Sequence, residues 1–201
     1  MATRSTAFSK KIDVLKIEVT GLTTPNVVEL NSLLAYGQRM TVLTINVQGL
    51  SIAQCLRLFS NLRLPNLACF STQGLPHEGL YAFINRHPTI TNITLGPCNR
   101  VGTQCALEST NSLQRLGEVR GDFKCVSKLV SSTTHRIFAR ASTTHNFGYL
   151  DLFQKISSVN AIIRLCSMEY APGDTDVMPR LAAALSRVST LRLVQSVDGV
   201  S

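Results

Sequence analysis

The feature of this chain that most constrains its fold is a short alternation of apolar and polar residues that recurs along its length. Three stretches align closely, and each reaches a glycine followed by leucine: residues 14–22, 42–50 and 68–75. Alternation of this kind predicts a β-strand with one buried face, and the glycine predicts a turn at its end. Looser versions follow at residues 90–95, 113–119, 137–141, 163–165 and 191–193. We therefore predict eight strands.

The spacing of these strands is typical of a repeat protein. Equivalent positions lie roughly 22 to 28 residues apart, within the 20–29-residue period of leucine-rich repeats. The pattern I-x-x-I-x-L-x-x-C at residues 90–98 fits the consensus of those repeats. We expect Leu95, and Leu165 in the pattern I-x-L at 163–165, to be buried on the inward side of their strands.

Helix signals lie between the predicted strands. Residues 51–54 read Ser-x-x-Gln, which is a capping box, and Thr24 followed by Pro25 predicts another helix start. Residues 97–112 form a connection without a clear helix pattern. Further predicted helix starts are Pro76, Asp122, Asn146 and either Asp174 or Asp176.

Strands that alternate with helices must be parallel, because each connection has to cross back to begin the next strand. An open solenoid and a closed eight-stranded barrel both satisfy this rule. Barrels of eight βα units typically need about 250 residues, and this chain has 201. We predict an α/β fold: an open leucine-rich-repeat-like solenoid of about eight strand–helix repeats, with a parallel sheet on its concave face. Residues 12–201 form this domain after a flexible tail at 1–11, and a small (βα)8-barrel-like enzyme is the alternative.

Parts of the chain resemble a known family. The stretch Leu-Pro-Asn-Leu at 64–67, together with residues 83–98, is similar to the C-terminal repeat region of the F-box-like leucine-rich-repeat proteins of mushroom-forming fungi. The similarity recurs at 113–116 and 178–185. In that family the repeats recognise a substrate, and an N-terminal F-box engages a ubiquitin-ligase adaptor. No F-box precedes the first predicted strand, so the resemblance implies an adaptor contact only if an F-box is supplied elsewhere.

Composition narrows the class of protein further. Apolar residues make up 44% of the chain and charged residues 16%, which excludes a disordered chain. No apolar run approaches the roughly 18 residues of a membrane span. The six cysteines form no C-x-x-C pair, and most lie in apolar stretches. We expect them to be core thiols of a cytoplasmic or nuclear protein.

The sequence contains no recognisable catalytic or cofactor motif. Nucleotide-binding glycine loops, the Gly-x-Ser-x-Gly nucleophile motif and the metalloprotease His-Glu pair are all missing. His77 and His87 flank a predicted helix, and we expect both to be capping or solvated. His135 and His145 lie at opposite ends of one predicted strand, roughly 30 Å apart and too distant to share a metal. We predict a protein that is not an enzyme and holds neither cofactor nor metal.

The outward positions of the later strands carry the candidate binding residues. With the apolar positions turned inward, five side chains face out: Arg136, Phe138, Arg140, Arg164 and Arg192. Adjacent strands lie about 4.8 Å apart, so the arginines would stack into a ladder, which Arg120 beside Glu118 extends. An ordinary solvated face is the alternative to a binding surface.

The net charge of +8 favours acidic partners. We therefore predict a protein-recognition scaffold whose partner is another protein with an acidic surface. Its narrower form is the substrate-binding repeat region of an F-box-type ubiquitin-ligase subunit. Nucleic-acid binding by the arginines is an alternative that we do not favour, and we expect no membrane partner.

Overall fold

The computed structural model describes residues 12–20, 24–35, 37–98, 105, 107, 113–141, 148–170, 179, 181 and 186–195. The tail predicted at 1–11 and the helix starts predicted at Asn146 and at Asp174 or Asp176 lie outside these residues. Among the helices of the described ranges, none has the length and apolarity needed to cross a bilayer.

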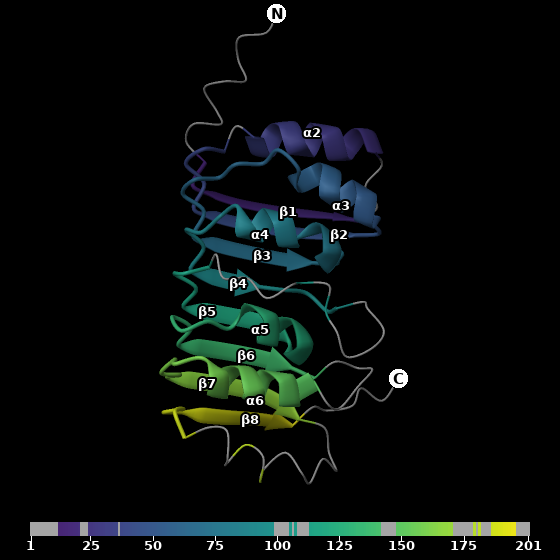
Figure 1. The fold of residues 1–201 in the computed structure, drawn as a ribbon. Coiled ribbons are helices and arrows are strands. Elements are labelled where there is room, and N and C mark those ends of the chain that lie inside the picture. The colour runs from purple at the N-terminus through teal and green to yellow at the C-terminus, as the bar shows by residue number, and fades with distance from the viewer. Residues whose placement is uncertain are drawn as a thin grey trace, which may run out of the picture.

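The described residues form one eight-stranded parallel sheet in which the strands follow their order in the sequence (Figure 1). β1 and β8 lie at opposite ends of the sheet, so it does not close into a barrel. This excludes the barrel alternative. The strands are β1 (Val14–Thr20), β2 (Val42–Gln48), β3 (Cys69–Gln73), β4 (Asn92–Thr94), β5 (Glu118–Asp122), β6 (Arg136–Arg140), β7 (Leu165–Tyr170) and β8 (Leu191–Gln195).

Five helices of the described ranges lie on one face of the sheet, as Figure 1 shows. The opposite face, which these helices leave uncovered, is called the open face below. This one-sided covering is the reason for the alternation in the sequence, because only one side of each strand is packed against helices. The helices are α2 (Thr24–Ala35), α3 (Ile52–Phe59), α4 (Tyr81–Asn85), α5 (Phe123–Leu129) and α6 (Gly148–Ser158), with a 3-10 turn, η1 (His77–Gly79), before α4.

One burial pattern recurs at each strand from β2 to β7. The position two residues before the strand, and the second and fourth positions counted from its start, are all buried under the helices. The carbonyl groups that precede the strands also repeat, since those of Asp13, Thr41, Ala68, Thr91, Gly117 and His135 each accept two N–H groups from the next repeat. The six buried trios are Met40, Leu43 and Ile45; Leu67, Phe70 and Thr72; Ile90, Ile93 and Leu95; Leu116, Val119 and Gly121; Thr134, Ile137 and Ala139; and Ile163, Cys166 and Met168.

The prediction for Leu95 is confirmed, because its side chain is 1% exposed. The prediction for Leu165 is wrong. Cys166 is the buried residue of β7, and Leu165 lies beside Arg136 on the open face and is only half-buried. A bend at Arg164 separates the buried Ile163 from the strand and shifts the alternation by one residue.

An aromatic cluster fills the core between β3, α3 and α4. The ring centroids of Phe59 and Phe70 lie 4.6 and 4.9 Å from that of Phe83, and the ring of His87 lies 4.2 Å from it. His87 is 2% exposed, so the expectation that it is solvated is wrong. It does cap α4, since its Nδ1 lies 2.7 Å from the Phe83 carbonyl oxygen, while its Nε2 accepts the N–H of Leu64 at 3.0 Å.

Local signals place the starts of α2 and α3 correctly, beside Thr24 and Ser51. Ser51 and Gln54 form the predicted capping box, in which each side chain accepts the backbone N–H of the other residue. Pro76 precedes η1, a 3-10 turn, and the α-helix begins only at Tyr81. Glycines with positive φ, Gly49 and Gly74, turn the chain after β2 and β3, a conformation that other residues rarely adopt.

Candidate functional site

The open face of β5 and β6 carries the largest group of interacting charged side chains in the described residues. Arg136, Phe138 and Arg140 project from β6 on this face, as predicted. Their partners across the register are Glu118, Arg120 and Asp122 of β5. These six residues are called the open-face patch.

Every arginine of the open-face patch has a partner within it. Glu118 accepts a hydrogen bond from Arg120 Nε at 2.7 Å and lies 3.3 Å from Arg136 Nη1. Arg120 also stacks on Phe138, with its guanidinium carbon 3.9 Å from the ring centroid. Arg140 Nη2 lies 3.9 Å from Asp122 Oδ1 and donates to the Leu95 carbonyl oxygen at 3.0 Å. The arginines are therefore held in fixed positions, while 41 to 51% of each side chain remains exposed.

The predicted arginine ladder is wrong. Arg164 precedes β7 and lies beside His135, and the β7 residue opposite Phe138 is Ser167. Arg192 does face the same side, two strands away from Phe138, with Ser167 between them. The β7 residues opposite Arg136 and Phe138 are Leu165 and Ser167, so β7 places no arginine between β6 and Arg192. Acidic residues of β5 neutralise the arginines of β6.

A hollow of about 320 Å³ adjoins the open-face patch. Phe138, Arg120 and Arg140 form part of its wall, and Glu169 and Ser167 of β7 form another part. Charged, aromatic and small polar groups thus surround one depression on the open face. The remaining lining residues are Thr94, Leu95, Gly121, Ala139 and Val194.

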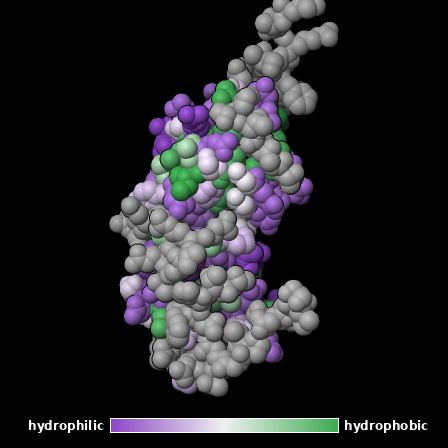
Figure 2. All heavy atoms as spheres, turned by 90° about the vertical axis from the view of Figure 1, so that its right-hand side faces the viewer, coloured by the Kyte–Doolittle hydropathy of each residue, from purple (hydrophilic) through white to green (hydrophobic). Residues whose placement is uncertain are grey.

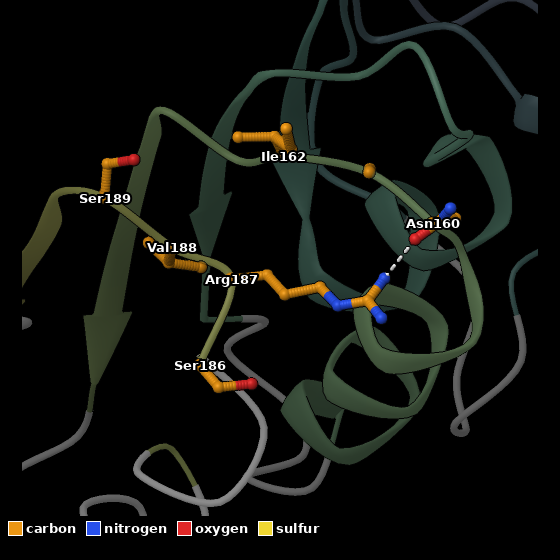
Figure 3. A pocket seen from close by; sticks show the side chains of 7 residues that line it. Asn160, Ile162, Ser186, Arg187, Val188 and Ser189 are labelled. Carbon is orange, nitrogen blue, oxygen red and sulfur yellow. Dashed lines mark hydrogen bonds between the residues drawn. The ribbon is translucent and has the colours of Figure 1, made fainter.

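A second hollow, of about 470 Å³, lies between the chain segments that precede β7 and β8 (Figure 3). Arg187 crosses it and donates a hydrogen bond from Nη1 to Asn160 Oδ1 at 2.5 Å. Among the described residues that line it, which also include Ile162 and Val188, Arg187 is the one ionisable side chain. These residues offer no pair of groups for acid–base or nucleophilic chemistry.

The helix side of the molecule carries exposed apolar side chains. Val28 and Leu33 of α2 are 58 and 49% exposed, and Ile52 and Leu56 of α3 are 47 and 45% exposed. Figure 2 shows hydrophobic surface in the upper half of the molecule, where these two helices lie. This apolar surface is the main alternative to the open-face patch as a contact surface.

The structure brings together four side chains that the sequence analysis left apart: His77, Cys98, Cys105 and Cys125, called the His–Cys cluster. Their potential ligand atoms all lie within 4.8 Å of one another. His77 Nδ1 is 3.3 Å from the sulfur atoms of both Cys105 and Cys125. The Cys98 and Cys105 sulfurs are 3.9 Å apart.

Adjacent strands position the His–Cys cluster. His77 begins the turn after β3, Cys98 follows β4, and Cys125 lies in the first turn of α5 after β5. Its position before the helix predicts that Asp122 caps α5. However, its side chain makes no capping hydrogen bond to that helix. Its Oδ2 instead accepts the Cys98 N–H at 2.7 Å and so fixes the backbone beside the cluster.

Burial and mutual contact perturb the groups of the His–Cys cluster. Burial lowers the pKa of His77, but hydrogen bonds with the thiols of Cys105 and Cys98 outweigh this and raise it to about 9. Hydrogen bonds with the same two cysteines, together with burial, raise the pKa of the Cys125 thiol well above its ordinary value. Thiolates that share one buried space repel one another, so each ionised thiol makes ionisation of the next one more costly.

The expectation that His77 caps a helix or is solvated is wrong, because its side chain is 4% exposed and points into the cluster. Cys55 and Cys166 are buried core residues, as predicted. Spacing alone could not reveal the cluster, because its members follow three different strands and no two form a C-x-x-C pair. The one available signal was the helix-free connection at 97–112, which contains two of the cysteines. His135 is exposed, and His145 lies outside the described residues.

Comparisons with protein-family models, curated proteins and solved structures give no match for this chain.

Proposed function

We propose that this chain is a protein-recognition scaffold built as a leucine-rich-repeat-like solenoid. The six buried trios support the architecture, because each follows the L-x-x-L-x-L spacing of those repeats. The helices of the described residues cover one face of the parallel sheet and leave the other face open to a partner. Solenoids of this kind commonly use their extended sheet surface for binding.

The observation that carries the proposal is the open-face patch. Its ion pairs and the stacking of Arg120 on Phe138 hold half-exposed guanidinium groups in place before any partner arrives. Fixing side chains in advance reduces the entropy lost on binding. Arginine and aromatic residues are also the types enriched at the energetic centres of protein interfaces.

The patch favours a partner segment that offers a carboxylate beside an apolar side chain. A guanidinium has five N–H donors, and Arg120 and Arg136 contact Glu118 through one nitrogen each. In the contacts of the described residues, the guanidinium groups of Arg120 and Arg136 therefore each keep N–H donors that a ligand can use. The neighbouring hollow, walled by Phe138, can accept the apolar group.

The narrower proposal is that the chain is the substrate-binding repeat region of an F-box-type ubiquitin-ligase subunit. Its support is the sequence resemblance at 64–67 and 83–98. This form predicts that the chain captures a substrate by itself and engages a ligase adaptor only when an F-box is joined to it.

Affinity capture with matched variants tests the proposal. The test variant replaces Arg136, Phe138 and Arg140 by Ala. The control replaces Lys16 and Glu18 of β1, an exposed ion pair of 2.9 Å that also faces out on the open side, at the other end of the sheet. We expect both variants to stay folded by circular dichroism and only the test variant to lose its partner proteins. If both variants captured the partner proteins equally, the open-face patch would not be the binding surface.

A further inference from the structure

We propose that the His–Cys cluster is a structural zinc site in which His77, Cys98, Cys105 and Cys125 are the four ligands. Three thiolates and one imidazole are a common donor set for structural zinc, and four protein ligands leave no open position for catalysis. Its four ligands lie outside the open-face patch, although Asp122 of the patch adjoins the cluster by accepting the Cys98 N–H. The zinc site does not depend on the proposed recognition function.

Three separations between ligand atoms of the cluster are close to those around a tetrahedral zinc ion. Bond lengths of about 2.3 Å to sulfur and about 2.0–2.1 Å to nitrogen place two sulfurs about 3.8 Å apart, and a sulfur and a nitrogen about 3.6 Å apart. The corresponding separations are 3.9 Å between Cys98 and Cys105 and 3.3 Å from His77 Nδ1 to each of two sulfurs. A disulfide would require its two sulfurs to approach to about 2.05 Å.

The surroundings of the cluster are also those of a metal site. Cys105 and Cys125 are 7 and 0% exposed, so the cluster is shielded from solvent. The Leu107 N–H donates to the Cys105 sulfur at 3.4 Å, as backbone amides commonly do to sulfur ligands of a metal. The carboxylate of Asp122 accepts the Cys98 N–H and so holds the backbone beside that ligand.

A zinc ion here would compensate for a gap in the repeat pattern. Each connection from β1 to β4 and from β5 to β7 includes a helix that packs on the sheet, whereas the sequence at 97–112 has no helix pattern. Cys105 and Leu107 of this connection are buried. Coordination would tie the connection to the turn after β3 and to α5, thereby joining three successive repeats.

The first test is the metal content of the full chain, purified under reducing conditions without chelator. We expect a zinc content near one ion per chain. Replacing zinc by cobalt should give the visible absorption of tetrahedral cobalt and a sulfur-to-metal charge-transfer band. Cys105→Ser should lower zinc affinity by more than the roughly 10–100-fold typical of losing an outer-shell partner. The matched control Cys69→Ser, a partly exposed thiol on β3 outside the cluster, should bind zinc normally.

Because a ligand variant can lose its fold, the native chain supplies a second test. Alkylation of the folded chain should leave Cys98, Cys105 and Cys125 unmodified until a strong chelator is added, and the chelator should lower the melting temperature. A folded, metal-free chain in which these thiols react without chelator would overturn the proposal. So would a Cys98–Cys105 disulfide found by mass spectrometry, or an unchanged cobalt spectrum in Cys105→Ser.

Discussion

At the scale of single residues, the sequence predicted the burial of apolar side chains better than the burial of polar side chains. Leu95 was predicted to be buried, and it is buried. The prediction succeeds because alternation places every second residue of a strand on the same side. His87 and His77 were expected near the surface, yet both are buried. Each finds its partner far away in sequence, Leu64 for His87 and Cys105 for His77. Partners that only the tertiary fold brings together cannot be predicted from local pattern.

The two leucines that the sequence treated alike provide a test of the strand register. Leu95→Ala should destabilise the chain by about 2–5 kcal/mol, because it removes a fully buried side chain. Leu165→Ala, on the open face, should cost about 1 kcal/mol or less. Urea unfolding of both variants measures the difference. Equal losses would place Leu165 inside the core and contradict the register at β7.

His87 should make stability depend on pH. Burial lowers the pKa of His87 below its usual 6.5, so the unfolded chain binds a proton more readily than the folded chain. The contribution of neutral His87 is therefore fully present above pH 6.5 and is lost as the pH falls from 6.5 through the lowered pKa.

Urea unfolding between pH 5 and pH 7.5 measures this dependence as a slope of the unfolding free energy. His87→Gln should flatten the slope relative to the native chain. His135→Gln, which changes an exposed histidine, should retain the native slope. If His87→Gln kept the full slope, His87 would not be the group responsible.

At the scale of elements, the number of strands and the capping box were predictable, because both depend on residues close in sequence. Which residues of β7 face the core could not be predicted in this way. Both I-x-L at 163–165 and the alternation of Cys166 with Met168 suit a strand, and only the bend at Arg164 decides between them. The same shift breaks the predicted arginine ladder, because it places Leu165 and Ser167, and not Arg164, beside the outward residues of β6. The arginines of β6 pair instead with acidic residues of β5.

The capping box of α3 predicts a measurable contribution to stability. Ser51→Ala removes the acceptor for the Gln54 N–H and should lower the free energy of unfolding by about 1 kcal/mol. Ser60→Ala, at the other end of the same helix, removes a bond to the Arg57 carbonyl oxygen on an exposed surface and should cost less than about 0.5 kcal/mol. Thermal unfolding of the two variants compares them, and a greater loss in Ser60→Ala would contradict the assigned cap.

At the scale of the whole molecule, the α/β sheet of eight parallel strands in sequence order follows from the repeat. Its terminal strands are less well packed than its centre: inward-facing Leu15 and Ile17 of β1 are only partly buried, whereas Leu43 and Ile45 of β2 are fully buried. The His–Cys cluster arises only at this scale, because three repeats must stack before its members meet. Two surfaces then remain as candidates for a partner, the open-face patch and the apolar outer side of α2 and α3.

Site-specific photo-crosslinking distinguishes these two surfaces most directly. A photoreactive phenylalanine analogue replaces either Ser167, on the open face beside Phe138, or Leu33, exposed on α2. If the chain is a scaffold that binds protein through the open-face patch, the Ser167 position should crosslink the captured partner and the Leu33 position should not. Crosslinking from Leu33 alone would contradict the account.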